Sequence, residues 1–252
     1  MGSFTVVIPA RLASSRLERK ALADLGGKPM VVRVAERAAQ SAANRIIVAT
    51  DAQEIESVCK AANLEVMMTR ADHPSGSDRL AEVIQRLDLN DEAIVVNVQG
   101  DEPLIPVDLI NQVANTLQSK PHCAIATAAV AIEDQAEIVN PNAVKVVLSK
   151  NNEALYFSRS IIPFDRSQSS PTYYRHLGIY AYRARFLREF SKLATSPLEQ
   201  AESLEQLRAL WHGYAIAVYI ASESPPPTTS QPLPPLLHQL ILPTKILPLK
   251  LP

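Results

Sequence analysis

Two adjacent carboxylates follow an apolar run in the middle of the chain. Residues 93–98 are rich in β-branched side chains, which is typical of a central strand buried on both faces. Because open α/β sheets bind ligands beyond the carboxyl ends of their strands, Asp101 lies where chemistry is expected. A carboxylate there suits Mg²⁺, which takes one or two protein carboxylates together with substrate phosphates. The alternative is that Asp101-Glu102-Pro103 caps a helix that begins near Val107.

A second segment that could do chemistry follows the first strand. Residues 9–20 carry four basic side chains and two hydroxyls. Guanidinium groups match phosphate oxygens bidentately and lysine supplies a mobile point charge, so the segment predicts a triphosphate pocket. An exposed basic loop is the alternative, because surface charge is common. The chain has neither a GxGxxG fingerprint nor a Walker loop, which argues against a dinucleotide oxidoreductase and a P-loop kinase.

The elements that must position these residues alternate in type through the first half of the chain. Short apolar runs are followed by segments of helical period, which predicts a mostly parallel sheet with helices on both faces and right-handed crossovers. We expect strands at residues 5–8, 45–49, 65–68, 93–98 and 124–130, and helices at residues 30–42, 54–62, 79–87 and 107–117.

The second half of the chain predicts an antiparallel excursion from this sheet. Residues 144–148 and 154–157 flank Lys150-Asn151-Asn152, a sequence typical of a hairpin turn. Further strands are expected at residues 176–182 and 215–220, with an amphipathic helix at residues 204–211 between them. The fold class is therefore expected to be α/β, with a mostly parallel mixed sheet.

The composition limits the class of partner. A chain of 252 residues with 47% hydrophobic residues can bury an extended core. A formal charge of −1 gives no global field for nucleic acid or an anionic membrane, so phosphate recognition must be local. Cys59 and Cys123 show no metal-ligand spacing and are expected to be reduced thiols of a cytoplasmic protein. The apolar start at residues 4–8 is too short for a signal peptide, so export is not expected.

The composition changes abruptly after Ser224. Residues 225–252 hold nine of the 19 prolines, with no glycine and no acidic residue, so neither a regular helix nor a central strand is expected. The same prolines exclude a membrane-spanning helix in this apolar stretch. We expect one domain over residues 1–224 and a poorly ordered, atypical tail over residues 225–252.

Several motifs occur together in a fixed order. They are Val7-Ile8-Pro9-Ala10-Arg11, Ser14-Ser15-Arg16-Leu17, Lys20, Thr69-Arg70-Ala71-Asp72-His73, Ser75-Gly76-Ser77-Asp78-Arg79, Asn97-Val98-Gln99-Gly100-Asp101-Glu102-Pro103, Tyr156-Phe157-Ser158-Arg159, Arg175-His176-Leu177-Gly178-Ile179-Tyr180 and Leu204-Glu205-Gln206-Leu207-Arg208. In this combination the chain resembles the 3-deoxy-manno-octulosonate cytidylyltransferase (CMP-KDO synthetase) family, from residue 4 to about residue 224.

The resemblance implies a fold, a reaction and an assembly. The fold would be nucleotide-diphospho-sugar transferase-like, paired as a homodimer through the antiparallel excursion. The reaction would join CTP and KDO (3-deoxy-D-manno-octulosonate) to give CMP-KDO and pyrophosphate, the activating step before KDO enters lipopolysaccharide. Mg²⁺ would be the cofactor. The enzyme would position the reactants and neutralise developing charge, as in other phosphoryl-type transfers.

The resemblance also implies residue roles. Asp101 would hold Mg²⁺, and Arg11 and Lys20 would grip the triphosphate as further catalytic residues. The nucleotide site would consist of Ala10, Arg11, Lys20, Ser75, Gly76, Ser77, Arg79 and Gln99. The sugar site would consist of Arg159, His176, Tyr180, Glu205 and Gln206.

Each sugar-site residue has a structural alternative. His176 on a strand could be a hydrogen-bonded core histidine, and Tyr180 lies four residues further, hence on the same face. Glu205 and Gln206 on an amphipathic helix would ordinarily face solvent. Arg159 could pair with a neighbouring acid.

The chain departs from the family pattern in two places. Glu18, Arg19 and Ala21 stand where the family typically has Pro-Gly before the lysine and Pro after it, which stiffens the loop. The family also continues past Ser-Pro-Pro to a second metal-binding Asp and a C-terminal helix, whereas no carboxylate follows Ser224 here. Losing a metal ligand typically weakens binding by about 10–100-fold or more. A shifted reading frame near codon 226 would explain the change, a hypothesis that resequencing the coding DNA tests.

Two other functions stay open at this point. One is a cytidylyltransferase for another acidic sugar, such as a sialic acid. The other is a catalytically defective remnant that binds CTP without turnover.

Overall fold

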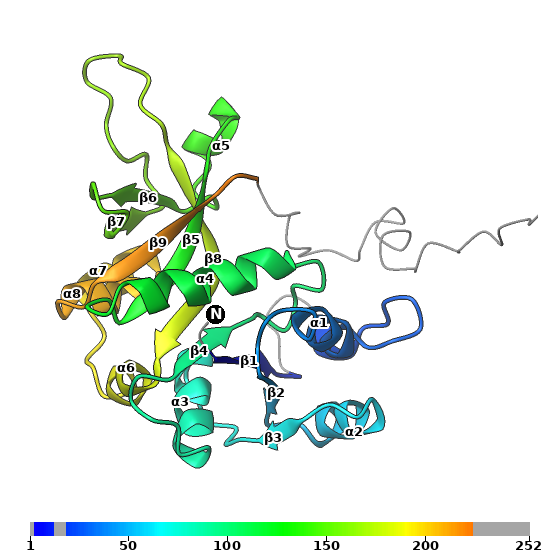
Figure 1. The fold of residues 1–252 in the computed structure, drawn as a ribbon. Coiled ribbons are helices and arrows are strands. Elements are labelled where there is room, and N and C mark those ends of the chain that lie inside the picture. The colour runs from blue at the N-terminus through cyan, green and yellow to red at the C-terminus, as the bar shows by residue number, and fades with distance from the viewer. Residues whose placement is uncertain (1–2, 13–18, 224–252) are drawn as a thin grey trace, which may run out of the picture.

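The computed structural model describes residues 3–12 and 19–223 (Figure 1). Arg16 in the basic segment and the tail over residues 225–252 lie outside these residues. The described strands are β1 (Phe4–Ala10), β2 (Arg45–Thr50), β3 (Val66–Met68), β4 (Ile94–Asn97), β5 (Ile125–Ala131), β6 (Lys145–Leu148), β7 (Ala154–Ser158), β8 (Tyr174–Arg183) and β9 (Ile216–Ala221). The described helices are the short 3-10 helix η1 (Lys20–Leu22) and α1 (Met30–Ala38), α2 (Gln53–Ala61), α3 (Gly76–Arg86), α4 (Val107–Ser119), α5 (Gln135–Val139), α6 (Ala184–Phe190), α7 (Pro197–Glu202) and α8 (Gln206–Trp211).

The strands form one sheet in the order β3-β2-β1-β4-β8-β5-β9. Strands β1 to β4 pair in parallel, and β9 pairs in parallel with β5. Strand β8 lies antiparallel between β4 and β5, and β6 pairs with both β7 and β8 to form the excursion. The predicted mixed α/β sheet with its antiparallel second half is confirmed.

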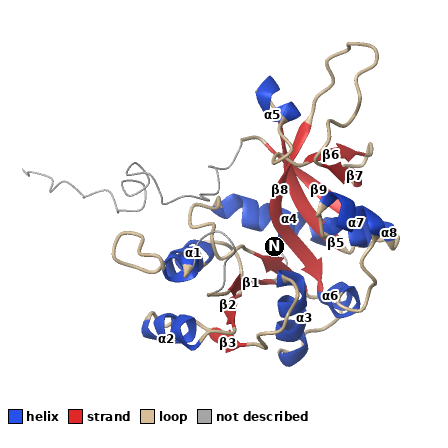
Figure 2. Cartoon of the chain, turned by 180° about the vertical axis from the view of Figure 1, so that it is seen from behind, coloured by secondary structure: helices blue, strands red, loops and turns tan. Residues whose placement is uncertain are grey.

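Helices cover both faces of the sheet (Figure 2). Because successive strand side chains point to opposite faces, Val6 and Ile8 enter one apolar core and Val7 enters the other. The first core is completed by α1, α2 and α4, and the second by α3, α6 and α8. Both faces of β1 are therefore buried, as its continuous apolar sequence predicts.

Two features of the helices differ from the sequence-based expectation. Helix α3 begins at Gly76, ahead of the expected start at Arg79, because the Ser75 hydroxyl accepts a hydrogen bond from the Asp78 amide and caps it. The segment 75–79 is therefore a helix start and not a loop. The helix expected at residues 204–211 is confirmed as α8, which begins two residues later at Gln206, but a further helix, α7, precedes it across Ser203, whose backbone is left-handed with φ 53°.

Helix α7 was missed although its signals are present in the sequence. Ser196 and Glu199 form a reciprocal capping box, and Pro197 occupies the first turn. Among the described residues, none of the helices combines the length and the apolar character that crossing a membrane requires.

Candidate active site

Asp101 lies next to the turn that follows β1. The Nζ atom of Lys20 lies 2.7 Å from Oδ2 of Asp101, and the Asp101 side chain is 41% exposed. The alternative in which this carboxylate caps α4 is wrong, because the N-cap residue is Pro106 and no side chain caps the helix. Two segments that lie far apart in the sequence are thus joined by a charge-assisted hydrogen bond at the carboxyl ends of β1 and β4.

Gly100 allows these two segments to approach closely. Strands β1 and β4 run in parallel with Val7 opposite Asn97, so the chain after β4 passes along Pro9. A Cβ atom on Gly100 would lie 2.8 Å from the carbonyl oxygen of Pro9. Only glycine fits at this contact, which brings Asp101 beside the Ala10-Arg11 turn.

Glu102 lies beside the Lys20–Asp101 pair and is largely buried. The pKa of the Glu102 carboxyl is raised to about 7, mainly by burial and also by the negative charge of Asp101, while the positive charge of Lys20 partly offsets both effects.

Arg19 occupies a backbone conformation that glycine favours. Its φ is 59° and its ψ is 23°, in the left-handed region. The sequence resemblance implies a glycine at this position, and a non-glycine residue in this conformation has a cost in backbone strain. The Arg19 guanidinium extends outward to an exposed ion pair with Glu54.

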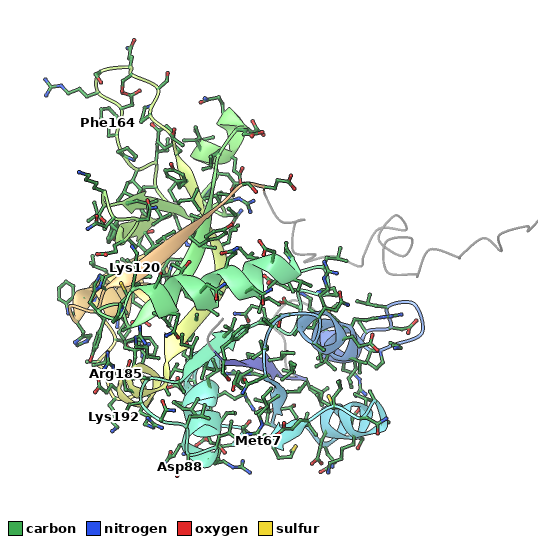
Figure 3. The ribbon with its side chains drawn as sticks, viewed as in Figure 1. Met67, Asp88, Lys120, Phe164, Arg185 and Lys192 are labelled. Carbon is green, nitrogen blue, oxygen red and sulfur yellow. The ribbon has the colours of Figure 1, made fainter. Side chains whose placement is uncertain are left out.

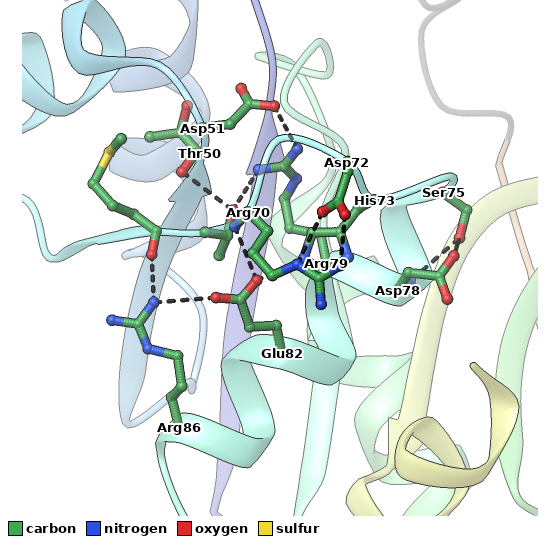
Figure 4. Close-up of polar contacts among 12 residues, drawn as sticks. Thr50, Asp51, Arg70, Asp72, His73, Ser75, Asp78, Arg79, Glu82 and Arg86 are labelled. Carbon is green, nitrogen blue, oxygen red and sulfur yellow. Dashed lines mark hydrogen bonds and ion pairs between the residues drawn. The ribbon is translucent and has the colours of Figure 1, made fainter. Parts of the chain in front are cut away.

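The predicted nucleotide residues after β3 form a polar network on α3 (Figure 4). Arg79 is fully buried, and its guanidinium donates to Asp51 at 2.7 Å and to the hydroxyl of Thr69. The Arg79 side chain is therefore committed to the protein interior and positions the start of α3. Its neighbour Ser75 bonds to Asp78, which fixes the same turn.

His176 and Tyr180 are brought together on β8. Their ring centroids lie 5.4 Å apart in spite of a bulge in the β5–β8 pairing, so the predicted shared face is confirmed. His176 Nε2 lies 3.0 Å from the hydroxyl of Thr127, and burial lowers the pKa of its imidazole to about 3. Tyr180 lies opposite Asn97 at the end of β4, which places this pair near the strand that leads to Asp101.

Arg159 is held in place by Glu202 at the end of α7. Its Nε donates to the Glu202 carbonyl oxygen at 2.7 Å, and its backbone amide donates to the Glu202 carboxylate at 2.9 Å. The same carboxylate accepts a hydrogen bond from Ser158 at 2.5 Å. The end of β7 is thus tied to the helices that precede β9.

Glu205 and Gln206 lie at the start of α8 and face inward. Together with Ser77 and Tyr180 they line a cavity of about 30 Å³. Burial raises the pKa of the Glu205 carboxyl, while the hydroxyls of Ser75 and Ser77 favour its charged form. The alternative in which Glu205 and Gln206 are solvent-facing surface residues is wrong, because Gln206 is only 7% exposed.

The predicted residues therefore fall into two connected groups. Lys20, Asp101 and the Ala10-Arg11 turn lie at the carboxyl ends of β1 and β4. Of the predicted sugar-site residues, His176 and Tyr180 lie on β8, Glu205 and Gln206 lie at the start of α8, and Arg159 directly follows β7. Gln99 links to the first group through its carbonyl oxygen, which accepts from the Glu102 amide at 3.2 Å.

The sequence analysis did not identify the residues that hold these two groups in position. Asp51 directly follows β2, in the same way as Asp101 follows β4, so the strand-end rule could have identified it. Tyr182, which also lines the cavity, follows Tyr180 by two residues and so shares its strand face. Glu202 and Thr127 carry no comparable signal in the sequence.

A further cluster lies at the opposite end of the sheet. Ligand atoms of His122, Cys123 and Glu153 lie within 4.8 Å of one another. His122 hydrogen-bonds the Glu153 carboxylate at 2.9 Å, and the Lys120 ammonium lies 3.7 Å from the same carboxylate. Both groups are therefore direct partners of the Glu153 carboxylate. The cluster precedes β5 and is separate from the Asp101 site.

Comparison with known proteins agrees with this geometry. A family model described as Cytidylyltransferase matches residues 5–217, so the chain belongs to the cytidylyltransferase class. Two curated relatives are named 3-deoxy-manno-octulosonate cytidylyltransferase. The protein of Polynucleobacter asymbioticus is 61% identical over 226 residues, covering 88% of this chain and 89% of the relative. That of Polynucleobacter necessarius subsp. necessarius is 59% identical over 232 residues, covering 91% of each chain.

Solved structures extend the comparison. A CMP:2-keto-3-deoxy-manno-octonic acid synthetase complexed with CTP superposes with a TM-score of 0.87 at 40% identity, covering 96% of this chain and 97% of that chain. A cytidylyltransferase from Leptospira borgpetersenii shares the fold at a TM-score of 0.55 and 14% identity, covering 88% and 76% respectively. The chain belongs to the 3-deoxy-manno-octulosonate cytidylyltransferase family.

Proposed function

We propose that this protein transfers CMP from CTP to the anomeric hydroxyl of KDO, giving CMP-KDO and pyrophosphate. The observation that carries the proposal is the 61% identity to a relative named for this activity, over 88% of the chain. In the reaction the sugar oxygen forms a bond to the α-phosphorus, the bond to pyrophosphate breaks, and the hydroxyl proton is lost. The product would serve lipopolysaccharide synthesis, and the buried free thiols of Cys59 and Cys123 support a cytoplasmic location.

Lys20 and Arg11 supply positive charge for the triphosphate. Lys20 is positioned by Asp101 at 2.7 Å, so its ammonium is already oriented at the strand ends before the nucleotide binds. Arg11 extends the same turn and offers a guanidinium that matches phosphate oxygens. Preorganised cations of this kind stabilise charge that develops as pyrophosphate departs.

Asp101 is the residue that would hold Mg²⁺. Its carboxylate is 41% exposed and adjoins the cationic turn, which fits an ion that shares its ligands between one or two carboxylates and substrate phosphates. When bound, Mg²⁺ would screen repulsion between the phosphates and the incoming acidic sugar. Lys20 already balances the charge of Asp101 in the absence of substrate.

The predicted sugar-site residues suit an acidic, hydroxyl-rich sugar. Arg159 supplies a cation for the KDO carboxylate. Neutral His176 and Tyr180 can exchange hydrogen bonds with hydroxyls, and the low pKa of His176 keeps it uncharged near pH 7. Glu205 and Gln206 add an acceptor and an amide at the start of α8.

A homodimer is proposed through the antiparallel excursion. Three large apolar side chains are exposed there: Leu155 on β7, and Ile161 and Phe164 on the loop that follows. Figure 3 shows Phe164 on a loop that extends away from the sheet, and its side chain is 84% exposed. An apolar surface of this kind is typical of an interaction site, and a second copy of the chain would cover it.

The experiment measures pyrophosphate release from CTP with KDO or sialic acid, at increasing Mg²⁺. Release with KDO supports the proposal. Release with sialic acid alone selects the other acidic sugar, and CTP binding without turnover selects the remnant lacking the second Asp.

We expect Asp101→Asn to lower kcat/KM by at least about 100-fold and to raise the Mg²⁺ requirement. Asp88→Asn is the control, because Asp88 follows α3 at the surface (Figure 3) and its left-handed φ of 49° also suits asparagine.

The Mg²⁺ assignment would be wrong if Asp101→Asn kept the activity and the Mg²⁺ dependence of the unmodified protein. The cytidylyltransferase proposal itself would be wrong if the unmodified chain neither bound CTP nor released pyrophosphate.

A further inference from the structure

One hydrogen bond joins the predicted nucleotide segment to the predicted sugar segment. The hydroxyl of Ser77, in the first turn of α3, donates to Oε2 of Glu205 at 3.1 Å. The two residues are 128 positions apart in the sequence. Ser77 is 3% exposed, so solvent competes little for this bond. The contact therefore connects two binding segments that are otherwise carried by different helices.

The other polar atoms at this contact are not yet satisfied. Within the described residues, Oε1 of Glu205 and Nε2 of Gln206 are buried without a hydrogen-bond partner. Both residues line the cavity of about 30 Å³, together with Tyr180 and Tyr182. Buried polar atoms normally have partners, so these two atoms indicate a missing ligand group or water.

The cavity is too small for the sugar as it stands. It has room for a water or two, whereas small-molecule pockets are roughly 300 Å³ or larger. It therefore admits only one polar group of a ligand at a time. The bond from Ser77 ties one oxygen of Glu205 to α3 at the wall of this cavity, so it restrains the carboxylate when a ligand group approaches Oε1.

We propose that Ser77 is a positioning residue that couples nucleotide binding to sugar binding, an inference that rests on the proposed function. A nucleotide bound at the first turn of α3 holds that turn in place, and through the Ser77 hydroxyl it also holds the Glu205 carboxylate with Oε1 directed to the sugar. The entropy cost of holding these side chains in place is met when the first ligand binds. The second ligand does not meet that cost again, so each ligand raises the affinity for the other. By thermodynamic linkage, the nucleotide raises the affinity for the sugar by the same factor as the sugar raises the affinity for the nucleotide.

The test measures KDO affinity by calorimetry with and without saturating CMP, which carries the base and ribose but has no pyrophosphate to lose. We expect CMP to raise KDO affinity by about 10-fold in the unmodified protein, within the range typical of coupled sites. In Ser77→Ala the factor should fall to below about 2-fold. Affinity for each ligand alone should change less than the coupling does, which separates positioning from a general structural defect.

Ser57→Ala is the matched control, because the exposed Ser57 hydroxyl bonds only to the Gln53 carbonyl oxygen among the described residues, on the remote helix α2. It should keep the full coupling. If Ser77→Ala does not fold, Ser77→Cys serves instead, since a thiol is a weak donor of similar size. Coupling that persists in the Ser77 variant, or that is absent from the unmodified protein, overturns the inference. Failure of the unmodified protein to bind either ligand overturns the proposed function instead.

Discussion

The close approach of Gly100 to Pro9 predicts a large effect from adding one methyl group at Gly100. In Gly100→Ala the new Cβ atom would lie 2.8 Å from the Pro9 carbonyl oxygen, and an ordinary contact requires about 3.4 Å. The difference of about 0.6 Å must come from separation of the two backbones. Neither can yield easily, because Pro9 is part of β1 in the centre of the sheet.

The expected result has two parts. Inserting a group into a well-packed region costs about 1–3 kcal/mol, so the free energy of unfolding should fall by that amount. The same separation moves Asp101 away from the Arg11 turn, and a misplacement approaching 1 Å can cost about 100-fold in rate. We therefore expect kcat/KM for CMP-KDO formation to fall by a factor of that order.

The assay combines urea denaturation with pyrophosphate release. Gly178→Ala is the matched control, because a Cβ atom at Gly178 would meet nothing within 4 Å. It should leave the free energy of unfolding nearly unchanged. A Gly100→Ala variant as stable and as active as the unmodified protein would refute the argument from close approach.

Two further predictions concern stability. Arg19→Gly should be about 1 kcal/mol more stable than Arg19→Ala in urea denaturation, because both lose the Glu54 ion pair but only glycine relieves the left-handed strain; equal stabilities would contradict the strain. The pKa of His176 falls from about 6.5 in the unfolded chain to about 3 in the folded protein. The stabilisation that comes from keeping His176 neutral is therefore complete above pH 6.5 and is lost as the pH falls toward 3. The unfolding free energy should drop by about 1.4 kcal/mol per pH unit across that window. His176→Asn should remove this slope and the exposed His122→Asn should keep it; a slope retained in His176→Asn would count against the burial argument.

Much of the fold follows from the local pattern of the sequence. The apolar runs that became β1, β2 and β4 are buried on both faces, so packing reinforces the preference of their β-branched residues. Helix α6 was not predicted, because its seven residues follow directly on β8 without a Gly or Pro to mark the boundary. Helix ends were least predictable where a capping hydroxyl, as at Ser75, sets the start.

The composition of the candidate site stays a prediction, and the orientation of its side chains could not be predicted from the sequence. Arg79 resembled a ligand-binding cation, yet it precedes the buried Val83 by one helical turn and shares its inward face. The buried charge of Arg79 is tolerated because Asp51, at the end of the neighbouring strand, accepts its hydrogen bond. This contact joins two segments that are distant in the sequence, so a local sequence pattern could not predict it. The roles assigned to the site residues stay predictions.

The position of β8 constrains how the chain can fold during its synthesis. Strands β4 and β5 succeed one another in the sequence, but β8 separates them in the sheet. The half that contains β5 and β9 therefore cannot join the half that contains β1 to β4 until residues 174–183 have left the ribosome. Until then, two incomplete sheet edges are open to mispairing, which is the state that chaperones protect.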